Sequence, residues 1–333
     1  MLLSAATQVS SLNFNYSNFD QARDRKDFDL ANGDSNIYKD ALQITRDTRQ
    51  SSLANSSGRI LYKERFKLWR DNRSVVASFN STFKLNISPE SGVPGPVGEG
   101  LAFIITGNRT LPNNSSGQWL GIVNEQTNGS SQNQIVAIEF DTRKSYSEDV
   151  DSNHIGLDVN SVYSIFQYPL EEWNVSISSG KDVNVNVKYD APSKSLSIDL
   201  SMVVNEGNTN STPVITMPID LSRYLPEDVY VGFSGATGNQ TQLNCVRSWT
   251  FMVENIEEGM NMKLMWILVG ILVPMLFCVG GTSCLWWRRS RQGESPPPVL
   301  PTEKPSFMWP VVTNFSESFS IYNIEKSSSN GSS

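Results

Sequence analysis

A stretch of 24 residues without a charged side chain, residues 264–287, constrains this chain more than any other feature. A helix of that length reaches about 36 Å, and the hydrocarbon core of a bilayer is about 30 Å thick. Pro274 and the Gly280-Gly281 pair would break a soluble helix, but membrane helices tolerate such residues. The charges that flank both ends of the stretch argue against the alternative, a buried helix of a soluble core. We expect one transmembrane helix over 264–287.

The charges around this stretch predict its orientation. Three arginines follow it at once, and three glutamates precede it: Arg288, Arg289 and Arg291, then Glu254, Glu257 and Glu258. Basic residues concentrate on the cytoplasmic side of membrane proteins. We therefore expect a single-pass, type I protein of the plasma membrane with its N-terminus outside. Residues 1–10 are expected to be the remnant of a signal peptide or a disordered segment, because they have no basic region and few apolar residues.

Glycosylation motifs and charge agree with an extracellular location. Twelve Asn-x-Ser/Thr sequons precede the apolar stretch, and we take them as N-glycosylation candidates. They are Asn15, Asn55, Asn72, Asn80, Asn86, Asn108, Asn113, Asn114, Asn128, Asn174, Asn210 and Asn239. Some sequons arise by chance in a chain rich in Asn and Ser. The net charge of −7 argues against a nucleic-acid partner, which requires a basic surface.

Before the apolar stretch, the hydrophobic residues repeat with a period of two. In 183–190, valines alternate with Asn and Lys, and 195–204 alternates in the same way after a short turn, which predicts a hairpin with one buried face. Similar segments recur at 11–19, 77–88, 99–106, 134–142, 154–162, 228–238 and 246–254. Many short antiparallel strands over about 250 residues indicate an all-β sandwich or jelly roll.

Acidic residues and the only histidine of the chain cluster in 139–154. Glu139 and Asp141 are two residues apart on a predicted strand, so their side chains project from the same face. Together with Asp149 and His154 they offer three carboxylates and one imidazole, a set suited to Mn²⁺ and Ca²⁺. The alternative is an ordinary acidic loop with a structural histidine.

Several motifs occur in one order along the chain: LNFNYSNF, GEGLAFIIT, VAIEFDT with HIGLDVNSV, and IDLSRYLPEDVYVGFSGATG. On these motifs the chain resembles the legume-lectin family from about Ser11 to Val253. The resemblance implies a concanavalin-like jelly-roll β-sandwich over 11–254 that holds Mn²⁺, Ca²⁺ and a monosaccharide. With a juxtamembrane linker at 255–263 and the apolar stretch behind it, the chain is similar to the ectodomain and anchor of plant L-type lectin-domain receptor-like kinases.

The resemblance also implies which residues bind the two metals. The family's Mn²⁺ ligands fall on Glu139, Asp141, Asp149 and His154, and Ca²⁺ would share Asp141 and Asp149. The places of the other Ca²⁺ ligands, a backbone carbonyl and an asparagine, hold Arg143 and approximately Ser145. The stretch between Asp141 and Asp149 is one residue shorter than in the family, so we expect Ca²⁺ binding to be weaker than Mn²⁺ binding.

The sugar-binding positions depart further from the family. Glu99 stands in place of an aspartate and Gln118 in place of a glycine, while Arg143 replaces an aromatic residue and Ser145 replaces the asparagine. Hydrogen bonds to a sugar depend on the placement of each polar group. We therefore expect a degenerate site with weak or absent binding of simple hexoses.

The sequence bears on two further classes of protein, glycosidases and kinases. Glycosidases of similar architecture carry Glu-x-Asp-x-x-Glu, but the third acid is replaced here by Lys144, so the general acid is missing and we expect no enzyme. Residues 288–333 contain no kinase motif and are too few for a kinase domain. They are rich in Pro and Ser, and we expect a disordered cytoplasmic tail. The alternatives are a kinase-less pseudoreceptor and a shortened gene model.

The sequence thus predicts a membrane-anchored, lectin-like cell-surface receptor or pseudoreceptor for a glycan or cell-wall ligand. The alternative is an adhesion or co-receptor module that binds a protein, peptide or apolar ligand without sugar recognition. The resemblance also implies a homodimer through a sheet edge, unless dense glycosylation blocks that edge, and a co-receptor kinase is a further expected partner.

Overall fold

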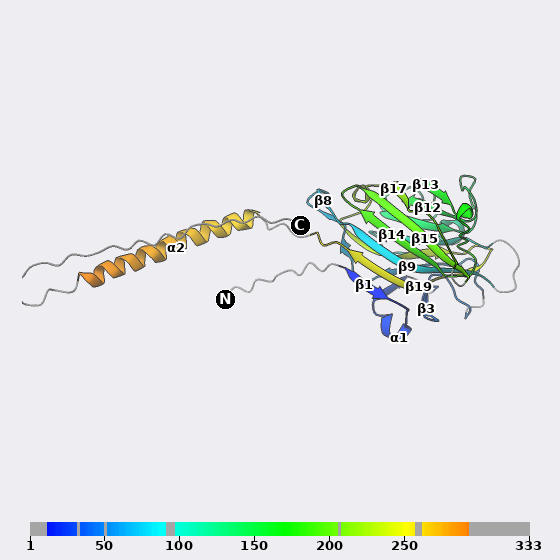
Figure 1. Ribbon diagram of the computed structural model, residues 1–333, viewed down its shortest axis with the longest axis horizontal. Coiled ribbons are helices and arrows are strands. Elements are labelled where there is room, and N and C mark those ends of the chain that lie inside the picture. Colours follow the sequence, from blue (N-terminus) through cyan, green and yellow to red (C-terminus); the bar gives the residue numbers. More distant parts are fainter. Residues whose placement is uncertain are drawn as a thin grey trace, which may run out of the picture. The chain divides into compact units, whose positions relative to one another are not determined.

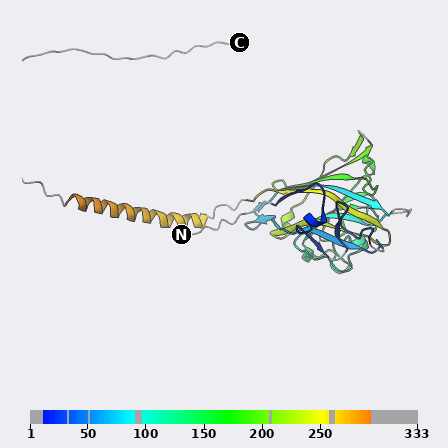
Figure 2. The same ribbon diagram turned by 90° about the horizontal axis from the view of Figure 1, so that it is seen from below.

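The computed structural model describes residues 12–31, 34–49, 52–90, 97–205, 208–256 and 262–292. The chain divides into two units, Met1–Gly259 and Met260–Ser333. In the first unit the strands are stacked in two layers (Figures 1 and 2). The predicted signal remnant 1–10, most of the linker 255–263 and the tail beyond residue 292 lie outside the described residues.

One layer is a nine-stranded antiparallel sheet in the order β16-β15-β14-β9-β19-β4-β3, with β1 paired to β19 and β17 to β15. Its strands are β1 (Asn13–Tyr16), β3 (Asn36–Tyr38), β4 (Ala41–Gln43), β9 (Phe79–Pro89), β14 (Val183–Asp190), β15 (Ser195–Asn205), β16 (Asn208–Ser211), β17 (Ile215–Pro218) and β19 (Gln242–Val253). The predicted hairpin is confirmed, because β14 and β15 pair in register from Val183 with Met202 to Asp190 with Ser195.

The second layer is an eight-stranded antiparallel sheet in the order β13-β12-β11-β10-β18-β5-β2, with β6 paired to β18. Its strands are β2 (Phe28–Ala31), β5 (Ser57–Tyr62), β6 (Phe66–Lys67), β10 (Gly100–Thr106), β11 (Ile135–Asp141), β12 (His154–Val159), β13 (Phe166–Pro169) and β18 (Asp228–Ala236). The other elements of this unit are a β7–β8 hairpin (Trp69–Arg70, Val75–Val76), the short helix α1 (Gln21–Asp24) and the 3₁₀ turns η1 (Gly117–Trp119), η2 (Ser131–Asn133), η3 (Glu171–Trp173) and η4 (Leu221–Arg223).

The main core lies between the two sheets and is rich in aromatic rings. Phe83 of β9 stacks on Phe103 of β10 at a centroid distance of 5.5 Å and meets Phe233 of β18 edge-on at 5.0 Å. Trp249 of β19 is fully buried, and its indole Nε1–H donates to Ser81 Oγ at 2.9 Å. Aromatic pairs of this kind stabilise a core beyond the area that they bury. The period of two in the sequence is explained by these inward-facing residues.

A second, smaller core covers the outer face of the eight-stranded sheet. All residues of β10 and β11 are buried, so both faces of these strands are covered. On the outer face, Ala102 and Ile104 of β10 pack with Leu120 and Ile122 of the long segment between β10 and β11. Leu120 of this covering segment also lines the cavity described below.

Arg59 of β5 ties the covering segment to the sheet. Its side chain is 2% exposed, and the guanidinium donates to the carbonyl oxygens of Gly121 at 2.7 Å and Thr110 at 2.9 Å. Burial lowers the pKa of Arg59 to about 10. A buried cation that is hydrogen-bonded to loop carbonyls fixes the position of that loop.

The second unit contains helix α2, Met262–Arg291, which begins two residues before the predicted helix and ends four residues after it. Its part from Trp266 to Arg291 is long and apolar enough to cross a membrane, by length and composition. Pro274 lies inside the helix, and Arg288, Arg289 and Arg291 lie in its last turn.

Candidate functional site

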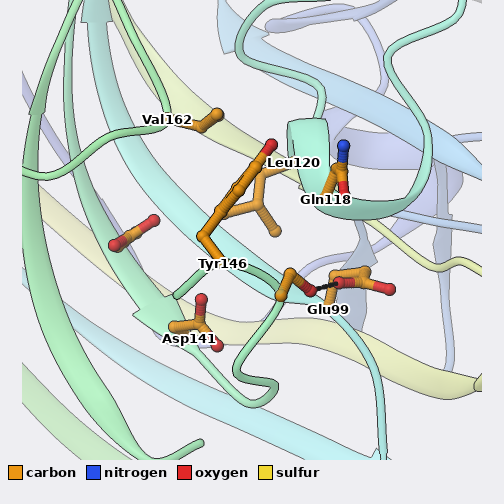
Figure 3. Close-up of a pocket in the computed structure, with 8 residues that line it drawn as sticks. Glu99, Gln118, Leu120, Asp141, Tyr146 and Val162 are labelled. Atoms are coloured by element: carbon orange, nitrogen blue, oxygen red, sulfur yellow. Dashed lines mark hydrogen bonds between the residues drawn. The ribbon is translucent and has the colours of Figure 1, made fainter. Parts of the chain in front are cut away.

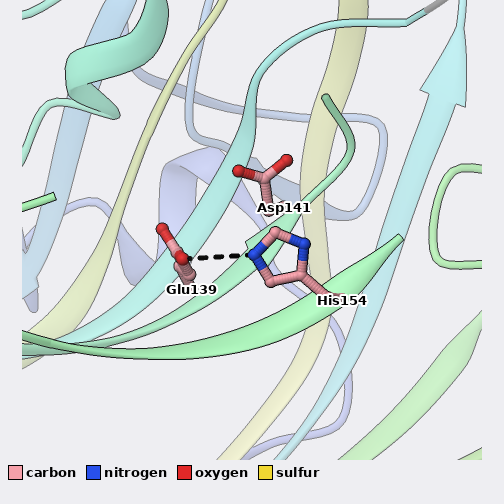
Figure 4. A group of neighbouring side chains, drawn as sticks. All are labelled: Glu139, Asp141 and His154. Carbon is pink, nitrogen blue, oxygen red and sulfur yellow. Dashed lines mark ion pairs between the residues drawn. The ribbon is translucent and has the colours of Figure 1, made fainter. Parts of the chain in front are cut away.

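Two adjacent strands of the eight-stranded sheet bring Glu139, Asp141 and His154 together. Asp141 of β11 pairs in register with His154 of β12, and Glu139 pairs with Gly156. One ligand atom from each of the three side chains lies within 4.8 Å of the other two (Figure 4). All three side chains are buried.

One ring nitrogen of His154 has no hydrogen-bond partner and lies close to the Glu139 carboxylate. Its Nδ1 lies 3.0 Å from the carbonyl oxygen of Asp151, while the buried Nε2 has no hydrogen-bond partner and lies 3.6 Å from Glu139 Oε1. Burial lowers the pKa of His154, but the Glu139 carboxylate together with the carbonyl and carboxylate of Asp151 outweighs burial, so the pKa is raised. A backbone carbonyl that accepts from Nδ1–H favours the neutral tautomer with its proton on Nδ1, in which the Nε2 lone pair faces the carboxylates.

Further carboxylates crowd this group. Asp158, on β12, is fully buried, and its Oδ2 has no hydrogen-bond partner. The Ser164 hydroxyl donates to Glu139 Oε1 and lies 2.8 Å from Asp158 Oδ1. Burial raises the pKa of Asp141 and of Asp158, and the charge of Glu139 raises both further. Buried carboxylates without a compensating cation are costly, so the cluster suits either bound protons or a hard divalent cation.

The close approach of Glu139 to β12 depends on Gly156. A Cβ atom at this position would lie 2.1 Å from Glu139 Oε1 and 2.3 Å from Ser164 Oγ. Any side chain other than hydrogen would therefore displace the Glu139 carboxylate.

Asp149 lies in the loop after β11 and is held by the backbone of that loop. Its Oδ2 accepts hydrogen bonds from the N–H groups of Ser145 and Tyr146, both at 2.8 Å, and the Lys144 ammonium donates to its carbonyl oxygen. Burial raises the pKa of Asp149, although the two N–H groups act against this. Asp149 is not part of the group within 4.8 Å, so its role as a metal ligand stays a prediction.

A surface hollow lies beside the acidic cluster and collects the four predicted sugar-binding residues. Glu99, Gln118, Arg143 and Ser145 all line it. Glu99 Oε1 accepts from Arg143 Nη1 at 3.0 Å. Glu99 Oε2 accepts from Ser145 Oγ at 2.5 Å, the hydrogen bond drawn at Glu99 in Figure 3. Both oxygens of the carboxylate are thus engaged by neighbouring residues of the same site.

A small cavity joins the hollow to the acidic cluster. Glu99, Gln118 and Ser145 line this cavity as well as the hollow, and Glu139 and Asp141 form part of its wall. Tyr146 lies across it near Leu120 (Figure 3), and its buried hydroxyl has no hydrogen-bond partner. The hollow and the acidic cluster are therefore parts of one site.

Comparison with known proteins decides the family. A model of the legume lectin domain matches residues 11–266. The chain belongs to the legume lectin family. The predicted resemblance and the β-sandwich fold are thereby confirmed.

Relatives of this legume lectin domain include receptor kinases and free lectins. The chain is 42% identical over 300 residues to the probable L-type lectin-domain containing receptor kinase S.5 of Arabidopsis thaliana, and this alignment covers 88% of the chain and 44% of the relative. It is 36% identical to Agglutinin-2 of Cladrastis kentukea, over 75% of this chain and 84% of the relative. The solved structure of lectin UEA-II complexed with galactose superposes with a TM-score of 0.63 at 32% identity, over 73% of this chain and 99% of the other. The chain spans less than half the length of the receptor kinase.

Sequence reasoning missed several residues of this lectin's site. Asp158 was detectable, because it lies four residues after His154 on one strand and alternation places both side chains on the same face. Ser164 and Tyr146 carried no such signal, since they lie in loops whose path the strand pattern does not specify. Asn55 and Asn239 were predicted only as sequons, yet both line the hollow.

One predicted glycosylation site differs from the others in this lectin domain. Asn86 is 5% exposed, and its Nδ2 donates to the Gly180 carbonyl at 3.0 Å and to Asp182 Oδ1 at 2.8 Å. An attached glycan would replace one of these N–H donors and would need space that the fold fills. The other eleven predicted sequon asparagines are at least partly exposed.

Proposed function

We propose that this lectin domain binds a glycan in the hollow and forms the extracellular part of a single-pass plasma-membrane receptor. The observation that carries this proposal is the position of the hollow, whose residues Glu99 and Ser145 also line the cavity that reaches Glu139 and Asp141. A polar hollow beside a cluster able to hold a cation matches the chemistry needed to fix sugar hydroxyls.

The residues present fit one divalent cation better than two. Glu139, Asp141 and His154 would hold a Mn²⁺-like ion, because His154 Nε2 lacks a hydrogen bond and the carboxylates beside it are buried. Such an ion would compensate the buried negative charge and hold the Asp141 end of the loop in place. A second, Ca²⁺-like ion fits less well, since Asp149 Oδ2 is taken by two backbone N–H groups and the Arg143 cation lies against Glu99.

Hydrogen bonds among the residues that line the hollow limit its affinity for small sugars. Arg143 and Ser145 each donate to one Glu99 oxygen, so a sugar hydroxyl can bond to this carboxylate only through a remaining lone pair or by displacing one of them. Replacing one good hydrogen bond by another gives little net free energy. We therefore expect weak binding of simple hexoses and tighter binding of larger glycans that also contact Gln118 and Lys144 at the rim.

The membrane part of the proposal is supported by α2 and by the relatives. The helix is long enough to span a bilayer and has three arginines in its last turn, which favours a cytoplasmic C-terminal end. Similarity to a receptor kinase supports a receptor role.

A glycan array probed with the full-length protein in lipid nanodiscs tests this function. We expect binding to extended glycans that EDTA abolishes and Mn²⁺ restores, and that Asp141→Asn abolishes. Glu227→Gln is the matched control, because Glu227 is a half-exposed acid paired with Lys67 outside the site. Failure of a well-folded, metal-loaded protein to bind any glycan, before and after its own N-glycans are removed, would refute the proposal. Ligand binding that persists in EDTA and in Asp141→Asn would instead support the adhesion or co-receptor module.

A further inference from the structure

Two N-glycosylation sequons lie on the wall of the proposed ligand site itself. Asn55 precedes β5 and Asn239 lies between β18 and β19, so the two are far apart in the sequence. Both line the same hollow as Glu99, Gln118 and Arg143, and both are exposed. No other sequon asparagine of the described residues lines this hollow.

Backbone hydrogen bonds hold the two sequon loops together and against the site. The Asn55 N–H donates to the Gly238 carbonyl at 2.9 Å, and the Thr237 N–H donates to the Ser56 carbonyl at 2.8 Å. The Gly117 N–H, next to Gln118, donates to the Thr237 carbonyl at 3.1 Å. The two asparagines therefore keep fixed places at the edge of the hollow.

The Asn239 loop lies directly on the Glu99 carboxylate. A Cβ atom at Gly238 would be only 2.7 Å from Glu99 Oε1. The attachment point of a glycan at Asn239 is thus one residue away from the backbone that touches the central acid of the site.

The side chains of Asn55 and Asn239 are also free to carry a glycan. Neither side-chain amide hydrogen-bonds to another described residue, whereas the Nδ2 of Asn86 makes two hydrogen bonds. N-glycosylation removes one N–H of the amide, so it breaks no hydrogen bond of the described residues at Asn55 and Asn239, whereas at Asn86 it breaks native contacts.

We propose that Asn55 and Asn239 carry N-glycans whose first sugars cover the hollow, so that the protein's own glycans compete with an external ligand. In the modification, the amide nitrogen bonds to C1 of the first N-acetylglucosamine of a lipid-pyrophosphate-linked oligosaccharide. The C1–O bond breaks, the lipid pyrophosphate leaves with the bonding electrons, and the amide proton passes to a base of the transferase. The competition with an external ligand rests on the proposed function, whereas the modification and the covering do not.

The hollow itself supports this arrangement. Its wall includes Gln118, Arg143 and Lys144, which offer donors for sugar hydroxyls at close range. A tethered glycan is present at a high effective concentration and therefore competes well even when its intrinsic affinity is low.

The test uses the full-length protein from a eukaryotic secretory host. Mass spectrometry after enzymatic deglycosylation in heavy-oxygen water measures occupancy at Asn55 and Asn239, and we expect both to be occupied. Lysine acetylation then reports covering without any ligand. We expect Lys144 to be labelled several-fold faster in Asn55→Gln/Asn239→Gln than in the wild type, while the half-exposed Lys194, which does not line the hollow, is unchanged.

Two variants separate loss of the glycan from damage to the fold. The double variant Ser57→Ala/Thr241→Ala removes the same two sequons and leaves both asparagines in place. It should therefore expose Lys144 as much as Asn55→Gln/Asn239→Gln does. Asn72→Gln removes a glycan from an exposed turn outside the hollow and should leave Lys144 unchanged. Unoccupied sites, or equal labelling of Lys144 with and without the two glycans, overturn the proposal.

Glycan-array binding distinguishes a failure of this inference from a failure of the proposed function. Binding that strengthens only when the two glycans are removed supports both. If Lys144 becomes exposed but no variant binds any glycan, the covering stands and the proposed function fails.

Discussion

Replacing Gly156 by alanine tests the acidic cluster with the smallest change available. The new methyl group would lie 2.1 Å from Glu139 Oε1 and 2.3 Å from Ser164 Oγ, where ordinary contact begins at 3.4 Å. Both atoms are the ends of side chains, so they can yield, but the Glu139 carboxylate must move by about 1 Å. Ligand positions in a metal site are set to within about 0.2 Å.

The expected magnitude follows from linkage between metal binding and folding. Wild-type protein at a metal concentration of about 100 times the Kd gains about 2.7 kcal/mol of stability. A loss of affinity of about 100-fold, typical of a disturbed metal site, leaves about 0.4 kcal/mol at the same concentration. For a domain of this size, the rise in Tm on adding metal falls from about 8 °C to about 1 °C. Overpacking itself lowers the metal-free stability by about 1–3 kcal/mol.

Scanning calorimetry with and without Mn²⁺ measures both effects, and isothermal titration gives the Kd directly. Gly235→Ala is the matched control, because its Cβ meets Gly100 O and Leu101 Cβ at 3.1 Å in the same sheet without touching the cluster. It should lose some stability and keep the full metal response. A Gly156→Ala protein that binds Mn²⁺ as tightly as the wild type would refute the proposed role of Glu139.

Three further predictions concern pH, the covering segment and topology. The folded-state pKa values of Asp141, Asp158 and His154 are raised, so the metal-free fold binds more protons than the unfolded chain. Its free energy of unfolding should therefore rise as the pH falls from neutral toward 4, and the stabilisation by Mn²⁺ should shrink over the same range. Urea titrations at several pH values, with and without Mn²⁺, measure both effects. Arg59→Met removes the buried donor to Gly121 and Thr110 and should lower the free energy of unfolding by about 3 kcal/mol. Relative to the wild type, hydrogen exchange in the variant should accelerate more in 107–122 than in β14. An equal acceleration in both segments would contradict the tethering role of Arg59. In sealed microsomes, the exposed sequons before the apolar helix should be glycosylated, while the two sequons after it, at Asn314 and Asn330, stay bare and 293–333 is digested by added protease. A protected tail would reverse the orientation.

The strands and the candidate site were predictable to different degrees. Alternation located β9, β14, β15 and β19, because each buries one face against the main core. The continuous apolar runs of β10 and β11 were recognised as strands, but not the second core on their outer face, which depends on Leu120 and Ile122 from a segment without regular structure. Short strands such as β3 and β4 were missed, since three residues carry too little pattern.

The contacts that bring the predicted site residues together differ in their separation along the sequence. Glu139, Asp141 and His154 are close because a single strand pairing aligns them, and their spacing together with the family resemblance indicated this. The engagement of Glu99 by Arg143 and Ser145 spans more than forty residues. It depends on how the loop after β11 folds back over β10, which no local pattern specifies.

The sequence by itself determined the all-β class and the apolar helix, because the period of two and the charge-free stretch are local patterns that each allow one kind of structure. It also determined which residue types were available for a metal and a glycan. Only the tertiary structure decided that Glu99 is already hydrogen-bonded, that Asp158 joins the acidic cluster, and that Asn55 and Asn239 stand at the edge of one hollow. These contacts join residues from separate segments. Which segments meet is set by the packing of the two sheets and by the path of the covering segment over the outer face of one of them.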